Sequence, residues 1–308
     1  MDKLPGQEIL NQVQRCKNEA LDFMQALTLS ESPSTEPQTQ LHVREQICDA
    51  LSDVDFSTIR IPGISSGGML YARPNSKNSE CAAQMMIGHY DTVWPVETLN
   101  KMPFEIEGNI VRGPGLYDMK AGITQAIFAL KTLKQLNLTP DLTPVIFLNS
   151  DEEIGSLEST RYIRRLAPCM ERVFVLEPSM GPAGKLKTSR KAVARYRITV
   201  VGKAAHAGLD PEAGASAILE LSHVIQKLFA LNDPQNGISV NVGTIDGGLR
   251  ANVVAPMSSA IVDVRTRTQA DAEAIEKVIL ALTADTPGTS LEITGQIGRP
   301  AMEGTPRN

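Results

Sequence analysis

The chain has 308 residues, of which 42% are hydrophobic and 21% are charged, an ordinary composition for a soluble globular protein of about two domains. The 30 basic and 35 acidic residues give a formal net charge of −5, without the basic excess or patch that indicates nucleic-acid binding. No apolar run approaches the roughly 20 residues of a membrane span, and the N-terminus lacks the apolar segment of a signal peptide. We therefore expect a cytoplasmic protein with no nucleic-acid or membrane partner.

The four cysteines are far apart in the sequence and show neither a CxxC motif nor paired spacing. They are Cys16, Cys48, Cys81 and Cys169. This spacing indicates reduced thiols in a cytosolic protein and not a disulfide framework.

The first part of the chain alternates apolar strands with helices, which predicts an α/β layer with a mostly parallel sheet. In chain order we expect a helix over 4–29, a polar Ser/Pro/Thr stretch at 30–40, a helix near 39–53, a strand over 82–89, an amphipathic helix over 119–136, and strands over 143–150 and 171–178.

From about residue 184 the pattern changes to β-α-β-β-α-β, the order of a small ferredoxin-like unit. Its predicted elements are a strand over 192–202, a helix over 211–231, strands over 237–248 and 255–266, a helix over 269–282 and a strand over 289–298. The expected domains are therefore an α/β domain at 1–183, this unit at 184–295, inserted after the α/β layer, and a remainder at 296–308.

His89 and Asp91 follow the predicted strand at 82–89 in the stretch MIGHYDTVWP. Residues two apart in extended backbone point to the same side, and sites in open α/β sheets gather at the carboxyl ends of strands. A histidine there could bind a metal through one ring nitrogen while a carboxylate holds the other N–H. For this pair alone, a structural histidine in a turn capped by Asp91 is the better explanation.

Asp118 lies in a glycine-rich turn, RGPGLYDMKAG, directly before a predicted helix. Because aspartate is a favoured N-cap, capping alone explains this residue. The surrounding glycines, Gly113, Gly115 and Gly122, allow close backbone approach and favour a functional turn.

Acidic residues also follow two apolar strands. Asp151, Glu152 and Glu153 occur in succession, and acids before a helix favour its dipole. Stacked carboxylates are nevertheless costly unless cations or protons compensate them, so a metal site explains the run equally well. Glu177 ends the strand of VFVLEPS, where a capping role explains it less easily.

His89, Asp118, Glu153 and Glu177 all fall at the carboxyl side of predicted strands or in the turns that leave them. One neutral imidazole with several carboxylates suits zinc, manganese or cobalt. Since there are more acids than one divalent ion uses, we expect two metal ions bridged by one carboxylate, which activate a shared water for hydrolysis. A further, unligated carboxylate would take the proton from that water.

Together these motifs resemble the M20 family of metallopeptidases, and in particular glutamate carboxypeptidases of the carboxypeptidase G type. GHYDTVWP (88–95), GPGLYDMKAG (113–122), SDEEIGS (150–156) and LEPS (176–179) occur in that family's order and approximate spacing. The resemblance runs from about residue 15 to the end of the chain. It implies a catalytic α/β domain and makes the ferredoxin-like unit the family's inserted lid and dimerisation domain.

The resemblance also implies a ligand set for two divalent ions, zinc in the first place, with manganese or cobalt as alternatives. His89 and Glu177 would bind one ion, Glu153 the other, and Asp118 both. The family's last metal-binding histidine follows the lid, but no histidine follows His223 and the chain stops after the last lid strand. We therefore expect an incomplete second metal site, a truncated catalytic domain and an exposed apolar sheet edge.

Further roles follow from the resemblance. Glu152 would be the general base, and Asp91 would orient the metal-binding histidine. His206, in GKAAHAG, would reach the neighbouring subunit's active site and donate to the oxyanion. Asn252 and Arg265, in LRANVVAP and DVRTR, would hold a substrate carboxylate, for which the planar guanidinium is well suited.

We therefore predict a metal-dependent amidohydrolase that cleaves the amide next to a C-terminal or N-acylated amino acid, such as glutamate, in a small peptide or acyl amino acid. We expect a homodimer paired through the lids. Two alternatives stay open. One is a catalytically silent fragment or module that binds a metal or an amino acid, and the other is an aminopeptidase or deacylase of the same clan.

Overall fold

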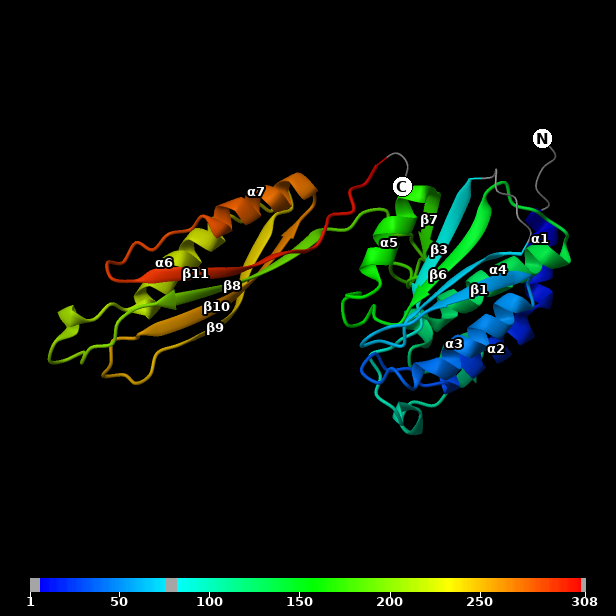
Figure 1. The fold of residues 1–308 in the computed structure, drawn as a ribbon, viewed down its shortest axis with the longest axis horizontal. Helices are drawn as coiled ribbons and strands as arrows, with labels where there is room; N and C mark the ends of the chain where they lie inside the picture. The colour runs from blue at the N-terminus through cyan, green and yellow to red at the C-terminus, as the bar shows by residue number, and fades with distance from the viewer. Residues whose placement is uncertain (1–5, 76–81, 306–308) are drawn as a thin grey trace. The chain divides into compact units, whose positions relative to one another are not determined.

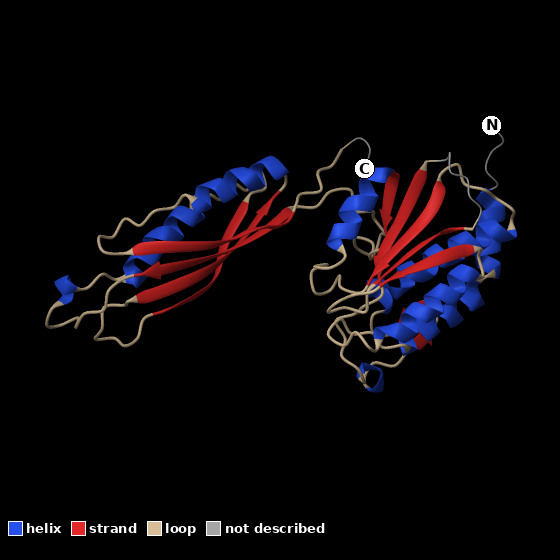
Figure 2. Ribbon diagram, in the orientation of Figure 1, coloured by secondary structure: helices blue, strands red, loops and turns tan. Residues whose placement is uncertain are grey.

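The computed structural model describes residues 6–75 and 82–305. Contacts divide the chain into two compact units, residues 1–178 and 179–308 (Figure 1). Each unit has its own sheet with helices packed on it (Figure 2).

The first unit is built on a five-stranded sheet in the order β1-β2-β6-β3-β7. Its strands are β1 (Phe56–Ile61), β2 (Met69–Pro74), β3 (Ala83–His89), β6 (Thr143–Asn149) and β7 (Met170–Val175). The strand β3 pairs in parallel with β6 and β7, whereas β2 pairs antiparallel with β1 and β6. Only β2 in this sheet runs against the others, so the prediction of a mostly parallel sheet is confirmed.

Helices cover both faces of this sheet (Figure 1). They are α1 (Gly6–Arg15), α2 (Lys17–Leu29), α3 (Gln40–Ser52) and α4 (Ala121–Gln135) on one face, and α5 (Thr160–Leu166) on the other. The single helix predicted over 4–29 is wrong in one point, because Cys16 has φ −83° and ψ 0° and separates α1 from α2.

Successive side chains of the central strand β6 point to opposite faces of the sheet, and each face is covered by helices. Ile146 and Leu148 pack with residues of α2, α3 and α4, whereas Val145 and Phe147 pack with residues of α5. A strand that is buried on both faces must be apolar at successive positions, as the sequence of β6 is. The edge strand β7 is different, because Phe174 and Val175 are exposed on it.

The remaining elements of this unit are short. They are η1 (Thr98–Asn100), the hairpin of β4 (Glu105–Glu107) and β5 (Ile110–Arg112), the turn η2 (Leu116–Lys120) and η3 (Ala167–Cys169).

The second unit has the predicted β-α-β-β-α-β order. It contains β8 (Ala192–Val201), the short η4 (Pro211–Ala213), α6 (Ala217–Phe229), β9 (Ser239–Gly247), β10 (Met257–Thr266), α7 (Gln269–Leu280) and β11 (Ser290–Arg299). The strand order is β11-β8-β10-β9 with antiparallel neighbours, which is the ferredoxin-like arrangement. Both helices lie on one face of the sheet, over a core that includes Tyr196, Ile198 and Val262 (Figure 1).

The structure also bears on the expectations for membrane spans and for the cysteines. Among the described residues, no helix has the length and apolar character needed to cross a membrane. Cys16 and Cys48 are free and buried and Cys169 is free and exposed, whereas Cys81 lies outside the described residues.

Candidate metal centre

The carboxyl ends of β3, β6 and β7 meet at one edge of the first sheet, and the predicted site residues follow them. His89 is the last residue of β3, and Glu177 comes two residues after β7. Glu152 and Glu153 lie in the turn after β6. The parallel pairing of β3 with β6 and β7 is what brings these distant segments to the same edge.

His89 is buried, and its two ring nitrogens have different surroundings. Nδ1 lies 2.9 Å from the backbone oxygen of Asp91 and 3.4 Å from its Oδ1 atom. Nε2 lies 3.0 Å from Oδ1 of Asp118 and 3.7 Å from Oε1 of Glu177. A proton on Nδ1, directed at Asp91, leaves Nε2 free to bind a cation among the carboxylates.

Asp118 is not an N-cap of α4. The cap position belongs to Lys120, and Asp118 lies inside the turn η2, where its φ of −118° and ψ of 98° are not helical. The turn begins at Gly115, whose φ of 64° is in the left-handed region that favours glycine. The capping explanation is therefore wrong, and the carboxylate points at His89 instead.

The three successive acids after β6 have separate environments. Oδ2 of Asp151 accepts hydrogen bonds from the backbone N–H groups of Glu158 and Ser159, so this buried carboxylate holds the start of α5. Glu152 and Glu153 join the site. Possible ligand atoms form two groups of three, and within each group the atoms lie within 4.8 Å of one another. One group comes from His89, Glu152 and Glu177, and the other from His89, Asp118 and Glu153.

The position of Glu177 depends on the close packing of Gly122 against the residue before it, Leu176. A Cβ atom at Gly122, on the first turn of α4, would lie 2.0 Å from the backbone oxygen of Leu176. Only glycine lets α4 approach the end of β7 this closely. The close backbone approach predicted for the glycines of this turn is thus confirmed at Gly122.

Charge is crowded at this edge of the sheet. Burial raises the pKa of Glu177 to about 7, with His89 opposing the rise and the neighbouring Asp118 and Glu152 adding to it. Burial likewise raises the pKa of Glu153. Burial lowers the pKa of His89, but Asp118 and Asp91 outweigh it and raise that pKa to about 11. One imidazole and four carboxylates whose negative charges repel are a donor set that fits divalent cations.

A segment that the sequence argument treated as a polar stretch lies directly beneath this site. Ser32 and Ser34 are buried, and their hydroxyls donate to the backbone oxygen of Tyr90 and to Oδ2 of Asp91 respectively. The backbone oxygen of Ser30 accepts a hydrogen bond from Nζ of Lys120. The sequence gives little signal for this role, because a segment of serines and proline is typical of a surface loop.

In the second unit, His206 and Asn252 lie together, because Ala207 donates its N–H to the backbone oxygen of Asn252. Both residues are exposed. Arg265 is near the other end of β10, eight residues from Met257, or roughly 25 Å along the strand. Its guanidinium forms two hydrogen bonds with the carboxylate of Asp263, at 2.7 and 3.1 Å.

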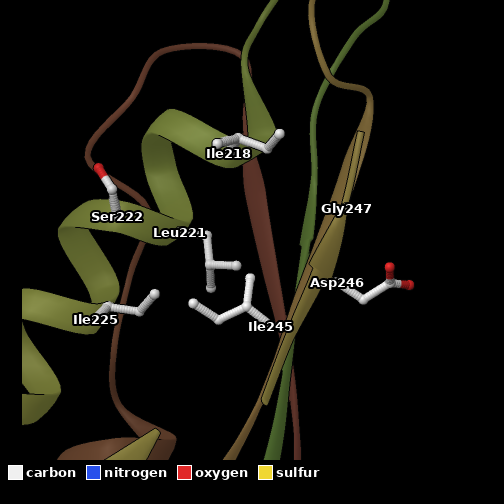
Figure 3. A pocket seen from close by; sticks show the side chains of 7 residues that line it. All are labelled: Ile218, Leu221, Ser222, Ile225, Ile245, Asp246 and Gly247. Atoms are coloured by element: carbon white, nitrogen blue, oxygen red, sulfur yellow. The ribbon is translucent and has the colours of Figure 1, made fainter. Parts of the chain in front are cut away.

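A hollow of about 200 Å³ in the second unit lies between α6 and β9 (Figure 3). Ile225 and Ile245 face each other there, whereas Asp246 points away from them (Figure 3). Ile218 and Leu221 also line it. Its apolar lining offers no cluster of acid, base and ligand atoms, so the site at the edge of the first sheet is the better candidate for chemistry.

Comparisons with known proteins find similar chains among peptidases. Residues 188–290 match the model of the M20 peptidase dimerisation domain. Carboxypeptidase G2 from Pseudomonas sp. (strain RS-16) is 29% identical over 220 residues, which cover 71% of this chain and 53% of the relative. The chain thus spans about half the length of this curated relative.

Two solved structures share the fold. An aminopeptidase PepT from Bacillus cereus has a TM-score of 0.76 at 20% identity, over 95% of this chain and 78% of its own. The YXEP protein of Bacillus subtilis, described as a dinuclear metal binding peptidase of the M20 family, has a TM-score of 0.61 at 14% identity, over 95% and 77%.

Proposed function

We propose that the chain is a metallopeptidase of the M20 family and that it hydrolyses the amide bond next to a C-terminal or N-acylated amino acid, as a glutamate carboxypeptidase does. The observation that carries the proposal is the grouping of Nε2 of His89 with carboxylate oxygens of residues from three other segments. The substrate would be a small peptide or an acyl amino acid.

The donor atoms suit two divalent ions, zinc first, with manganese or cobalt as alternatives. His89 and Glu177 would hold one ion, Glu153 the other, and Asp118 would bridge them. Support comes from the short distances among these side chains and from the description of the YXEP protein as a dinuclear metal binding peptidase. When bound, such ions supply Lewis acidity for the attack of water on a carbonyl.

The residues of the chain would contribute the proton transfers and the orientation. Glu152 would take the proton from the attacking water and deliver it to the leaving amine. Asp91 would hold Nδ1–H of His89 through its backbone oxygen and its carboxylate, both within 3.4 Å. Oδ2 of Asp151 instead accepts hydrogen bonds from the backbone N–H groups at the start of α5.

The substrate-binding roles rest on the second unit. His206 would donate to the oxyanion from the partner subunit, and Asn252 and Arg265 would bind the substrate carboxylate. Arg265 can present its fork to a substrate only by exchanging its present partner, Asp263. Asn252 lies in the turn that precedes β10, whereas Arg265 is near the end of that strand.

A homodimer through the second unit is part of the proposal. The match to a peptidase dimerisation domain supports it, and so does the open edge of β9, which pairs only with β10 within the described part of the chain. Ile245 on β9 and Ile218 on α6 are exposed apolar residues beside that edge. Unpaired edges with apolar side chains favour pairing with another chain.

The proposal is tested by loading the protein with zinc, manganese or cobalt and assaying N-acyl glutamates and dipeptides. Matched substrates with an amidated C-terminus or a blocked α-amine show which of the two free termini the enzyme requires. A requirement for a free α-carboxylate supports the carboxypeptidase hypothesis, and a requirement for a free α-amine supports the aminopeptidase hypothesis. Metal binding without any hydrolysis would support the silent binding module instead.

A further inference from the structure

Asp91 is a buried carboxylate whose two oxygens have different partners. Oδ2 accepts a hydrogen bond of 2.6 Å from the hydroxyl of Ser34 and one of 3.3 Å from the backbone N–H of Glu153. Oδ1 forms no hydrogen bond within the described residues and lies 3.4 Å from Nδ1 of His89. Oδ2 is therefore held by two hydrogen-bond donors, whereas Oδ1 faces the imidazole without a hydrogen bond of its own.

Ser34 is itself fixed by the backbone around it. Its N–H donates to the backbone oxygen of Thr92, and Thr92 donates to the backbone oxygen of Ser32. This short ladder binds the segment at 32–34 to the chain just after His89. The hydroxyl of Ser34 is also 3.2 Å from the oxygen of Thr92, but the carboxylate is the nearer acceptor and carries the charge.

We propose that Ser34 is a positioning residue whose hydroxyl orients the carboxylate of Asp91, an inference that rests on the proposed metal centre. With the carboxylate in this orientation, His89 keeps its proton on Nδ1 and presents Nε2 to the metal. Without this donor, Oδ2 would retain only the longer bond from Glu153. A buried carboxylate that lacks a hydrogen-bond donor rotates toward other partners, and this change weakens its hold on the imidazole.

The chain offers a matched control in Ser32. It is buried in the same segment, and its hydroxyl also donates one hydrogen bond, but to the backbone oxygen of Tyr90. Ser32→Ala and Ser34→Ala thus remove the same group at neighbouring positions, and only the second removes a bond to Asp91. Ser34→Thr keeps a hydroxyl at the position and tests rescue.

The experiment titrates the metal-free proteins with Co²⁺ and follows the visible absorption of the bound ion, with thermal unfolding in EDTA as the measure of stability. Loss of a group that supports a metal ligand typically costs 10–100-fold in affinity. We expect Ser34→Ala to bind Co²⁺ roughly 10-fold or more weakly and with an altered spectrum. Ser32→Ala and Ser34→Thr should bind like the wild type.

The inference is overturned if Ser34→Ala binds Co²⁺ with unchanged affinity and spectrum, or if Ser32→Ala loses as much. Absence of Co²⁺ binding by the wild type would instead overturn the metal centre, and with it this role. If Ser34→Ala does not fold, ¹⁵N spectra of histidine in the zinc-loaded wild type decide. A proton on Nδ1 of His89 agrees with the inference, and a proton on Nε2 contradicts it.

Discussion

Nε2 of His89 lies 3.0 Å from Oδ1 of Asp118, although 29 residues separate the two in the chain. The imidazole is 1% exposed and the carboxylate 50% exposed, so one partner is fixed in the protein and the other faces the solvent. A cation that enters from solvent can therefore reach the buried nitrogen beside the exposed carboxylate.

Replacing Glu152 by Gln separates proton transfer from metal binding. A general base contributes typically 10²–10⁴-fold to the rate, so we expect kcat to fall by about that factor. Metal affinity should stay within a few-fold of the wild type, as measured by Co²⁺ titration. An equal loss of affinity would mean that Glu152, which lies close to His89 and Glu177, is a ligand instead.

Replacing Gly122 by Ala should weaken the metal centre without touching a ligand. The added Cβ would meet the backbone oxygen of Leu176 and displace Glu177, the next residue. We expect metal affinity to fall by about 10–100-fold, the range seen when ligand positioning is lost. Gly6→Ala is the control, since a Cβ there would have nothing within 4 Å. Unchanged affinity in Gly122→Ala would contradict this account of how Glu177 is held.

Glu158 should make folding stability depend on acid pH. Its carboxylate accepts hydrogen bonds from Ser65, Ser66 and the backbone N–H of Ile64. Although burial opposes the shift, the hydrogen bonds from Ser65 and Ile64 lower the pKa of Glu158 from 4.5 to about 2. A carboxyl with a lowered folded pKa stabilises the fold above its unfolded pKa, and this contribution is lost as pH falls from 4.5 toward 2.

The measurement compares the wild type with Glu158→Gln in thermal unfolding of metal-free protein. We expect the variant to be less stable at pH 7 and the difference to shrink between about pH 4.5 and pH 2. Glu171→Gln, at an exposed position on β7, is the control. A difference between wild type and Glu158→Gln that is the same at pH 7 and pH 2 would contradict the assignment.

Ile245→Asp should dissociate the proposed dimer. The residue is 63% exposed on the edge strand β9, and a charge there would be buried without a partner on pairing. We expect sedimentation velocity to show the mass of a monomer for the variant and of a dimer for the wild type. The control is Ile59→Asp on β1, an exposed isoleucine on the edge strand of the first unit. Equal dissociation by both variants would argue against the β9 edge as the interface.

Local pattern was sufficient to predict the elements that fix the site. The apolar runs of β3, β6 and β7 identify the strands, and parallel pairing then places His89 and Glu177 at one edge. The spacing of apolar residues also predicts the helices α6 and α7. These features depend on periodicity, which single sequences record well.

Features that depend on tertiary contacts were not predictable in the same way. The serines at 32 and 34 are polar and flanked by proline, so they are typical of a surface loop, yet they are buried because Tyr90 and Asp91 supply acceptors. The break between α1 and α2 at Cys16 interrupts an unbroken helical pattern. Asp118 resembles an N-cap until the fold brings His89 beside it.

The most direct test of the metal centre is a crystal structure of the zinc-loaded chain with anomalous data collected at the zinc absorption edge. The account predicts an anomalous peak about 2.0–2.1 Å from Nε2 of His89, next to the carboxylates of Asp118 and Glu177. Zinc found only at the histidines of the second unit, His206 or His223, or no zinc at His89, would contradict it.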